Sequence, residues 1–192
     1  MGYTHYWNQH RDFTTEEWSA LAKDVKILFA CLPQEKVKAP GHGFLGGMKL
    51  VKPEICGPFS PKNPPVVNDE EIVFFDKRDP LRTQSFRLNR TIEVLGPQGP
   101  FDGINGEYGC KTNLEAYDIV VCAVLILAQF RGGDSIDLKS DGKFSEEWDR
   151  AFDLVERQVG GLWDRQERRD YFKTKDMLLK QDLDQEDSRE ER

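Results

Sequence analysis

The sequence has few residues of the kinds that build disulfide frameworks, metal clusters and membrane spans. It contains four cysteines and three histidines in 192 residues, and no two cysteines have the Cys-x-x-Cys spacing of a zinc or dithiol motif. The longest apolar run, Ile119–Ala128, has ten residues, whereas a helix that spans a bilayer needs about 20. The opening Met-Gly-Tyr-Thr-His-Tyr-Trp lacks the basic and apolar regions of a secretory signal. We therefore expect a cytoplasmic protein with free thiols and no membrane contact.

The chain also lacks an excess of positive charge. The chain has 27 lysines and arginines against 34 aspartates and glutamates, which gives a formal net charge of -7. Nucleic acids and anionic membranes are bound through basic surfaces, so general nucleic-acid binding is excluded. Hydrophobic residues make up 38% of the chain, which is enough for the core of one domain.

The hydrophobic pattern predicts an α+β fold, in which about three helices pack on a small, mainly antiparallel sheet. Two of the expected strands, 71–75 and 84–90, are separated by a turn-rich segment and predict a hairpin. The other strands are expected at residues 1–7, 48–51 and 135–138. Helices are expected at 15–32, at 113–131, and from Ser145 to Gly160, with Thr14 and Glu17 forming a capping box for the first.

The helix at 113–131 is expected to be central and buried, because Ile119–Ala128 is apolar on every face. Thr112 and Glu115 have the spacing of a second capping box, and two glycines follow Arg131 as a stop signal. Several residues of the run are β-branched, so a buried strand is the competing interpretation. The length and the caps favour the helix.

Composition divides the chain into a core and two less regular parts. Residues 1–163 are expected to form a single domain that carries a Pro/Gly-rich insertion at 33–66, where seven of the ten prolines lie. Residues 164–192 form a charged extension, since 18 of these 29 residues are charged. A further helix can dock through its few apolar residues, and we expect disorder beyond about residue 181.

Cys110 is the first candidate for chemistry. The expected helix start and Lys111 both favour a thiolate, so Cys110 is the best candidate for a nucleophile. Such catalysis also needs an imidazole, and the alternative is a small residue packed in a turn. Asp118 and Tyr117 are the acid–base alternative, or else an internal tie between helix and sheet.

Lys111 and the helix start also suggest an anion site, because backbone amides at a helix N-terminus bind phosphate. The glycines before Lys111 do not have the offsets of a phosphate-binding loop. His5, His10 and Asp12 could be imagined as metal ligands, but positions 5 and 10 point to opposite faces of a strand. We therefore predict no metal site and no cofactor.

Taken together, the residues resemble a family found widely in bacterial and phage genomes. Its members begin like Met-Gly-Tyr-Thr-His-Tyr-Trp and carry a segment similar to Cys110-Lys111-Thr112, four residues, Tyr117-Asp118 and an apolar helix. A Gly-Asp and then a Ser-Asp-Gly follow, which are here Gly133-Asp134 and Ser140-Asp141-Gly142. The resemblance covers the first 30 residues and roughly 105–160. It implies a shared polar site but no activity, because no activity is established for the family.

Three functions remain open, and whether the chain is an enzyme is undecided. The first is binding of a small molecule, such as a phosphorylated metabolite or a nucleotide, where the first strand meets the central helix. Its expected lining consists of His5, Tyr6, Cys110, Lys111, Tyr117, Asp118 and Asp141. The second is a hydrolase or transferase that uses Cys110 or Asp118. The third is an interaction protein that engages a partner through the proline-rich segment or the charged extension.

Overall fold

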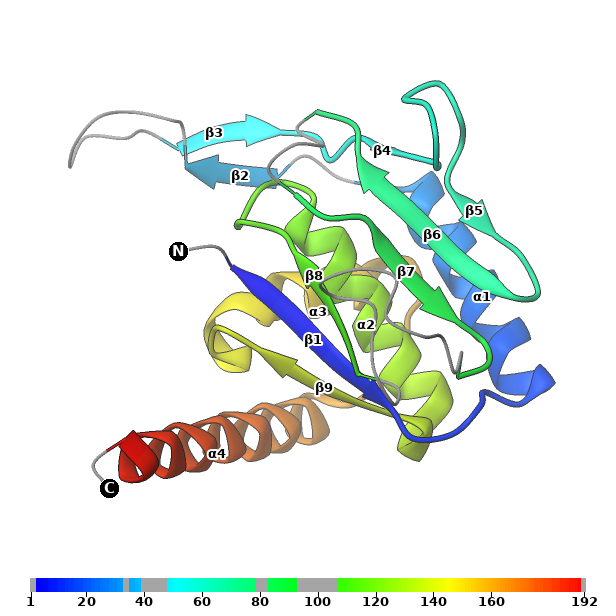
Figure 1. The fold of residues 1–192 in the computed structure, drawn as a ribbon. Helices are drawn as coiled ribbons and strands as arrows, with labels where there is room; N and C mark the ends of the chain where they lie inside the picture. Colours follow the sequence, from blue (N-terminus) through cyan, green and yellow to red (C-terminus); the bar gives the residue numbers. More distant parts are fainter. Residues whose placement is uncertain (1–2, 33–34, 39–47, 79–82, 93–106, 191–192) are drawn as a thin grey trace.

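A computed structural model describes residues 3–32, 35–38, 48–78, 83–92 and 107–190 (Figure 1). It confirms the α+β class. The helices are α1 (Thr15–Ala30), α2 (Asp118–Gly132), a 3-10 turn (Gly133–Ser135), a π-helical turn (Phe144–Trp148), α3 (Asp149–Gln158) and α4 (Arg165–Glu190). The strands are β1 (Thr4–Gln9), β2 (Glu35–Lys38), β3 (Met48–Val51), β4 (Ile55–Cys56), β5 (Val66–Val67), β6 (Glu71–Asp76), β7 (Phe86–Asn89), β8 (Glu107–Lys111) and β9 (Ile136–Ser140).

The strand β1 is the middle strand of a three-stranded antiparallel sheet. It pairs with β8 on one side and with β9 on the other, so that His5 lies opposite both Cys110 and Ser140. Residues opposite each other in antiparallel strands point to the same face. Side chains from three distant parts of the sequence therefore share one face of the sheet.

A second antiparallel sheet contains β4, β6 and β5, with β7 paired to β6. The pairing of β6 with β7 confirms the predicted hairpin, although residues 79–82 of its loop lie outside the described residues. The two sheets meet where Gln84 bonds to Lys111: its amide donates to the Lys111 carbonyl at 2.8 Å, and its side-chain oxygen accepts from the Lys111 amide at 2.9 Å. In Figure 1 the strands from β9 to β6 accordingly lie next to one another.

The insertion at 33–66 contributes two short antiparallel pairings. β2 pairs with β3, and β4 pairs with β6. The strand expected at 48–51 is confirmed as β3, whereas β2 was not expected from the sequence. The remaining residues 39–47 lie outside the described part of the chain.

The helix α2 forms the centre of the core, as predicted. All ten residues of Ile119–Ala128 are buried, and the helix packs against α1, α3 and β9. The strand interpretation of this run is therefore wrong. Burying each large aliphatic side chain contributes about 1.5–3 kcal/mol, so this helix makes a large contribution to hydrophobic stabilisation.

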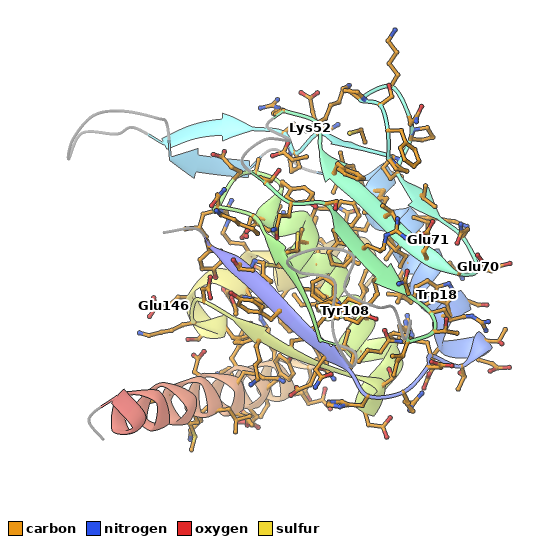
Figure 2. All side chains as sticks on the ribbon, viewed as in Figure 1. Trp18, Lys52, Glu70, Glu71, Tyr108 and Glu146 are labelled. Carbon is orange, nitrogen blue, oxygen red and sulfur yellow. The ribbon has the colours of Figure 1, made fainter. Side chains whose placement is uncertain are left out.

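The helix α1 covers α2 and begins as the sequence predicts. The Thr14 hydroxyl accepts from the Glu17 amide, and the Glu17 carboxylate accepts from the Thr14 amide. Trp18 is buried, and its indole nitrogen donates to the Asn68 carbonyl at 2.8 Å, which ties α1 to the second sheet (Figure 2). Arg131 of α2 donates to the Asp24 carboxylate at 2.7 Å.

The C-terminal helices differ in part from expectation. Ser145 does not cap α3: a π-helical turn precedes that helix, and the Ser145 hydroxyl donates to Asp176 of α4. The chain leaves α3 through Gly160 and Gly161, both with positive φ, as the predicted stop requires. α4 extends to Glu190. The disorder expected beyond about residue 181 stays a prediction. Within the described ranges, no helix combines the length and apolar character needed to cross a bilayer.

Candidate functional site

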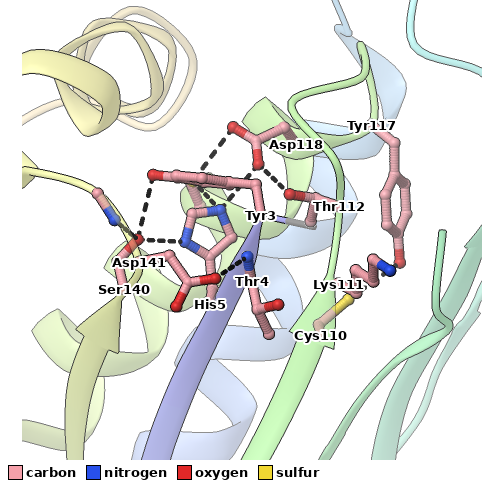
Figure 3. A network of polar contacts seen from close by, with 12 residues as sticks. Tyr3, Thr4, His5, Cys110, Lys111, Thr112, Tyr117, Asp118, Ser140 and Asp141 are labelled. Atoms are coloured by element: carbon pink, nitrogen blue, oxygen red, sulfur yellow. Dashed lines mark hydrogen bonds and ion pairs between the residues drawn. The ribbon is translucent and has the colours of Figure 1, made fainter. Parts of the chain in front are cut away.

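His5 lies at the centre of a polar network inside the sheet and helix layers (Figure 3). It is completely buried, and its ring contacts Trp148 edge to face with the centroids 5.0 Å apart. The strand β1 positions it, because its neighbours Cys110 and Ser140 in the register point to the same face, where α2 packs.

Both ring nitrogens of His5 have a partner. Nδ1 lies 3.0 Å from the Ser140 hydroxyl, and Nε2 lies 2.8 Å from Oδ1 of Asp118. The Ser140 oxygen also accepts from the Gly142 amide at 3.3 Å and lies 3.1 Å from the Tyr3 hydroxyl. Every contact is satisfied when Tyr3 donates to Ser140, Ser140 donates to Nδ1, and Nε2 donates to Asp118. The donors then run in one direction and end on the Asp118 carboxylate.

Asp118 is the first residue of α2, where the positive end of the helix dipole favours a negative charge. Its Oδ1 accepts from the Thr112 hydroxyl as well as from His5. Its Oδ2 is 3.9 Å from the Cys122 sulfur. The side chain keeps 14% of its surface exposed, whereas the side chain of His5 keeps none. Asp118 is therefore an end of the network that reaches solvent.

The predicted capping box at Thr112 and Glu115 is wrong, and α2 begins five residues later than expected, at Asp118. Asn113 and Leu114 have φ values of 54° and 57°, which a right-handed helix does not allow. The Thr112 hydroxyl binds Asp118 instead of a helix amide. The amides of Thr112 and Asn113 both donate to the Tyr3 carbonyl, at 2.9 and 3.2 Å. The loop is thus folded back onto β1, where it delivers Thr112 to the network.

Asp141 joins the network at its edge. Its carboxylate accepts from the Thr4 amide at 2.8 Å, and its own amide donates to the Thr4 carbonyl at 3.1 Å. Although Asp141 is exposed, these two hydrogen bonds to Thr4 fix the turn after β9 to the start of β1. A role for Asp141 in ligand binding stays a prediction.

Cys110 and Tyr117 form a separate buried pair. The Tyr117 hydroxyl donates to the carbonyls of Gln84 and Phe74, at 3.1 and 3.3 Å, and lies 3.8 Å from the Cys110 sulfur. Burial raises the pKa of the Cys110 thiol to about 12 and raises the pKa of Tyr117 well above its usual value. The expectation of a Cys110 thiolate at a helix start is wrong for two reasons: Cys110 is on β8, and its thiol has no solvent contact.

Tyr6 and Lys111 do not reach His5. Lys111 pairs with Thr4 in the register and Tyr6 pairs with Gly109, so both side chains leave the sheet on the face opposite to His5. Lys111 is also not at a helix start, because β8 ends there and α2 begins at Asp118. The structure therefore does not bring together the lysine and the helix amides that suggested a phosphate site.

Cys122 belongs to the site, although sequence reasoning did not include it. It lies one turn after Asp118 on α2, fully buried, with its sulfur 3.2 Å from Nε2 of His5. Burial raises the pKa of this thiol well above its usual value. One donor atom from each of His5, Asp118 and Cys122 lies within 4.8 Å of the others, so this trio could hold a metal ion. The prediction of no metal site considered His5 only with His10 and Asp12.

Three hollows are formed by described residues away from the network. One is lined by Phe152, Trp163 and Arg168 with their neighbours, one lies between Ser145 and Met177, and one lies at Phe59 and Phe75. None of the three is lined by a residue of the His5 network. The partly exposed side chain of Asp118 gives the network one contact with solvent.

No family model, curated protein or solved structure matches the chain. The resemblance to a bacterial and phage family consequently stays a prediction. Thr112, Asp118 and Ser140, three of the polar residues in the motifs that carry it, are in direct contact with the network, two with His5 and one with Asp118.

Proposed function

We propose that the chain binds a small polar molecule through Asp118, at the point where β1 meets the beginning of α2. One observation carries this proposal: Ser140, His5 and Asp118 are hydrogen-bonded in series, and the series ends on a partly exposed carboxylate. Oδ1 of Asp118 already accepts two bonds, while among the described side chains Oδ2 has only the distant Cys122 sulfur. A ligand that donates from a hydroxyl or an amino group would complete this carboxylate.

A nucleotide or a sugar phosphate is still a suitable ligand. The structure favours recognition of its sugar or base, whereas the sequence suggested recognition of its phosphate. The sugar hydroxyls or a base amino group would donate to Asp118. The phosphate end has weaker support than the sequence suggested, because Lys111 lies on the other face of the sheet.

The test is mass spectrometry of small molecules released when the purified protein is denatured, combined with a thermal-shift screen of nucleosides, nucleotides and sugar phosphates. Asp118→Asn is the informative variant, because it keeps the side-chain shape and replaces an acceptor with a donor. Asp69→Asn, in the exposed turn before β6, is the matched control. We expect the wild type and the control to bind and Asp118→Asn to lose at least tenfold in affinity. Equal binding by a folded Asp118→Asn would refute the proposal.

An acid–base enzyme is the second candidate. The 2.8 Å contact between Nε2 and Oδ1 favours it, because a carboxylate backed by a histidine can accept a proton from a bound substrate. The two candidates separate when the released compound is incubated with fresh protein. A change in its mass over time supports the enzyme, and unchanged recovery supports binding alone. The buried Cys110 thiol, with its raised pKa, gives no support to a cysteine-dependent reaction.

A further inference from the structure

The trio of His5, Asp118 and Cys122 combines three different metal-binding groups. Their imidazole, carboxylate and thiol come from β1 and from one face of α2, because residues four apart on a helix are neighbours. Two of them are fully buried, and Asp118 alone of the three is partly exposed. Such a set is unusual in a core that is otherwise apolar along α2.

The separations of the donor atoms match those of a tetrahedral site. Nε2 lies 2.8 Å from Oδ1 of Asp118 and 3.2 Å from the Cys122 sulfur, and the sulfur lies 3.9 Å from Oδ2. Bonds of about 2.0 Å to nitrogen and oxygen and about 2.3 Å to sulfur, at tetrahedral angles, place the ligand atoms about 3.3–3.5 Å apart. Nε2 lies about 0.3–0.5 Å closer than this to Oδ1 and to the sulfur, so the side chains must move apart to admit an ion between them.

The Cys122 thiol has no short, well-directed hydrogen bond within the trio. The single hydrogen on Nε2 is directed to Asp118, so it is not available to the sulfur at the same time. The thiol can donate to Oδ2 of Asp118 only across 3.9 Å. A cation bound by all three groups would satisfy the nitrogen, the sulfur and the carboxylate together, once the thiol proton is released to solvent and the ring proton is on Nδ1, where it donates to the Ser140 oxygen.

The surrounding contacts are those that orient metal ligands. The other ring nitrogen of His5 bonds to the Ser140 hydroxyl, which fixes the ring and leaves Nε2 directed at the trio. The Thr112 hydroxyl holds the carboxylate of Asp118. Partners of this kind orient ligands, and losing one costs roughly 10–100-fold in metal affinity.

We propose that His5, Asp118 and Cys122 bind a divalent transition metal, with zinc as the best fit. Nitrogen, oxygen and sulfur donors in a tetrahedral arrangement suit zinc, whereas magnesium and calcium prefer oxygen ligands alone. Three protein ligands leave a fourth position for water or a ligand atom, on the side where Asp118 reaches solvent. This inference does not depend on the small-molecule proposal, because the trio can bind an ion with no other ligand present.

The experiment uses the full chain with Cys31→Ser, which removes an exposed thiol that could bind metal on its own. The protein is freed of metal with a chelator and titrated with Zn²⁺ in competition with a coloured chelator, and then with Co²⁺. We expect one ion per chain and, with cobalt, the charge-transfer absorption of a thiolate ligand. Cys122→Ser should lose that absorption and at least tenfold in zinc affinity.

Cys110→Ser is the matched control, since Cys110 is as buried as Cys122 but lies outside the trio. It should keep both the stoichiometry and the absorption. If Cys122→Ser does not fold, Asp118→Asn and Ser140→Ala replace it, and both should lower the zinc affinity tenfold or more. Wild-type protein that binds no zinc, or equal losses in Cys110→Ser and Cys122→Ser, would overturn the proposal.

The ligand screen of the previous section is run on the same metal-free protein, so that the two proposals can fail separately. Small-molecule binding without any metal binding would refute the metal-site proposal alone. Zinc binding with no small-molecule ligand, before or after the metal is added, would remove only the proposed function.

Discussion

The ring of His5 connects a strand end to a helix start, because one nitrogen bonds to Ser140 of β9 and the other to Asp118 of α2. The side chain has no exposed surface, so neither bond can be exchanged for water. Removing a partner of a buried polar group costs about 1–3 kcal/mol. Substitution of His5 should therefore disturb stability as well as the site, which is why Asp118 is the better position for functional tests.

The four cysteines should differ sharply in reactivity. At neutral pH we expect iodoacetamide to modify Cys31 first, because it is the exposed cysteine, while Cys110 and Cys122 react only when the protein unfolds. Peptide mass spectrometry after a time course of labelling gives the order. Rapid modification of Cys110 in the folded protein would contradict its burial.

The Cys110 thiol should make stability depend on alkaline pH. Its pKa is raised to about 12 in the folded chain, so the folded state holds the proton more tightly than the unfolded state. The resulting stabilisation is complete below about pH 9 and is lost as the pH rises toward 12, by up to about 1.4 kcal/mol per pH unit. Urea unfolding between pH 8 and 11 should show a steeper loss for the wild type than for Cys110→Ala.

Cys122 and Tyr117 are also buried with raised pKa values, and Cys110 contributes to both shifts after burial. The difference between the two proteins therefore includes these interactions as well as the titration of Cys110 itself. Parallel curves for wild type and Cys110→Ala would mean that the thiol reaches solvent in the folded state.

At the scale of elements, the sequence predicted structure well where the cause is local. The capping box at Thr14 and Glu17 and the apolar run of α2 both follow from neighbouring residues, and both are confirmed. The same capping pattern at Thr112 failed, because its hydroxyl binds Asp118 and two residues with positive φ intervene. A capping pattern cannot show that a partner six residues away competes for the hydroxyl.

The strand β8 was not predicted, because Glu-Tyr-Gly-Cys-Lys has no clear alternation and includes a glycine. Its pairing with β1 makes it a strand, and Gly109 leaves room for the Tyr6 ring, which an added Cβ would meet at 3.2 Å.

The site was recognised in part. His5 and Asp118 were identified from the sequence, and the structure joins them directly. Ser140 and Thr112 were noticed as turn and cap residues, and their contact with the network depends on strand register and loop conformation. Cys122 was hidden, because a helix that is apolar all round does not reveal which residue faces the sheet.

At Leu114, in the loop before α2, glycine should give a more stable protein than alanine. Leu114 has a φ of 57° and is exposed, so its side chain adds strain and little packing. A left-handed conformation costs an L-residue about 1 kcal/mol more than glycine. Leu114→Gly should therefore be more stable than Leu114→Ala by about 1 kcal/mol in urea unfolding. Higher stability of the alanine variant would show that Leu114 is not held in this conformation.

At the scale of the whole molecule, α4 has two parts with different contributions. Its first turns carry Tyr171 and Phe172, which pack against Phe152 and Trp163 of the preceding region. Lys175 also forms an ion pair with Asp137 of β9. The side chains beyond residue 180 lie outside the described part of the structure.

Two truncations test this division. Removing residues 181–192 should leave the thermal midpoint nearly unchanged, within about 0.5 kcal/mol of stability. Ending the chain at residue 164 should cost several kcal/mol, because it uncovers the buried Phe152 and removes Phe172. Calorimetry on both proteins gives the comparison, and a large loss from the shorter deletion would show that the end of α4 is docked. Backbone hydrogen exchange over 181–190 tests the expected loss of order there.

The central position of β1 also determines when the protein can acquire its site during synthesis. Its partners begin at Glu107 and Ile136, so β1 must stay unpaired while more than a hundred further residues are made. At roughly 5–20 residues per second, this interval lasts about 5–20 s. During this interval both edges of β1 and its Trp7 side chain are uncovered, and unpaired strand edges favour chaperone binding or aggregation. Any fragment that stops before β9 lacks Ser140, so the ring of His5 in that fragment has lost the hydroxyl that orients it.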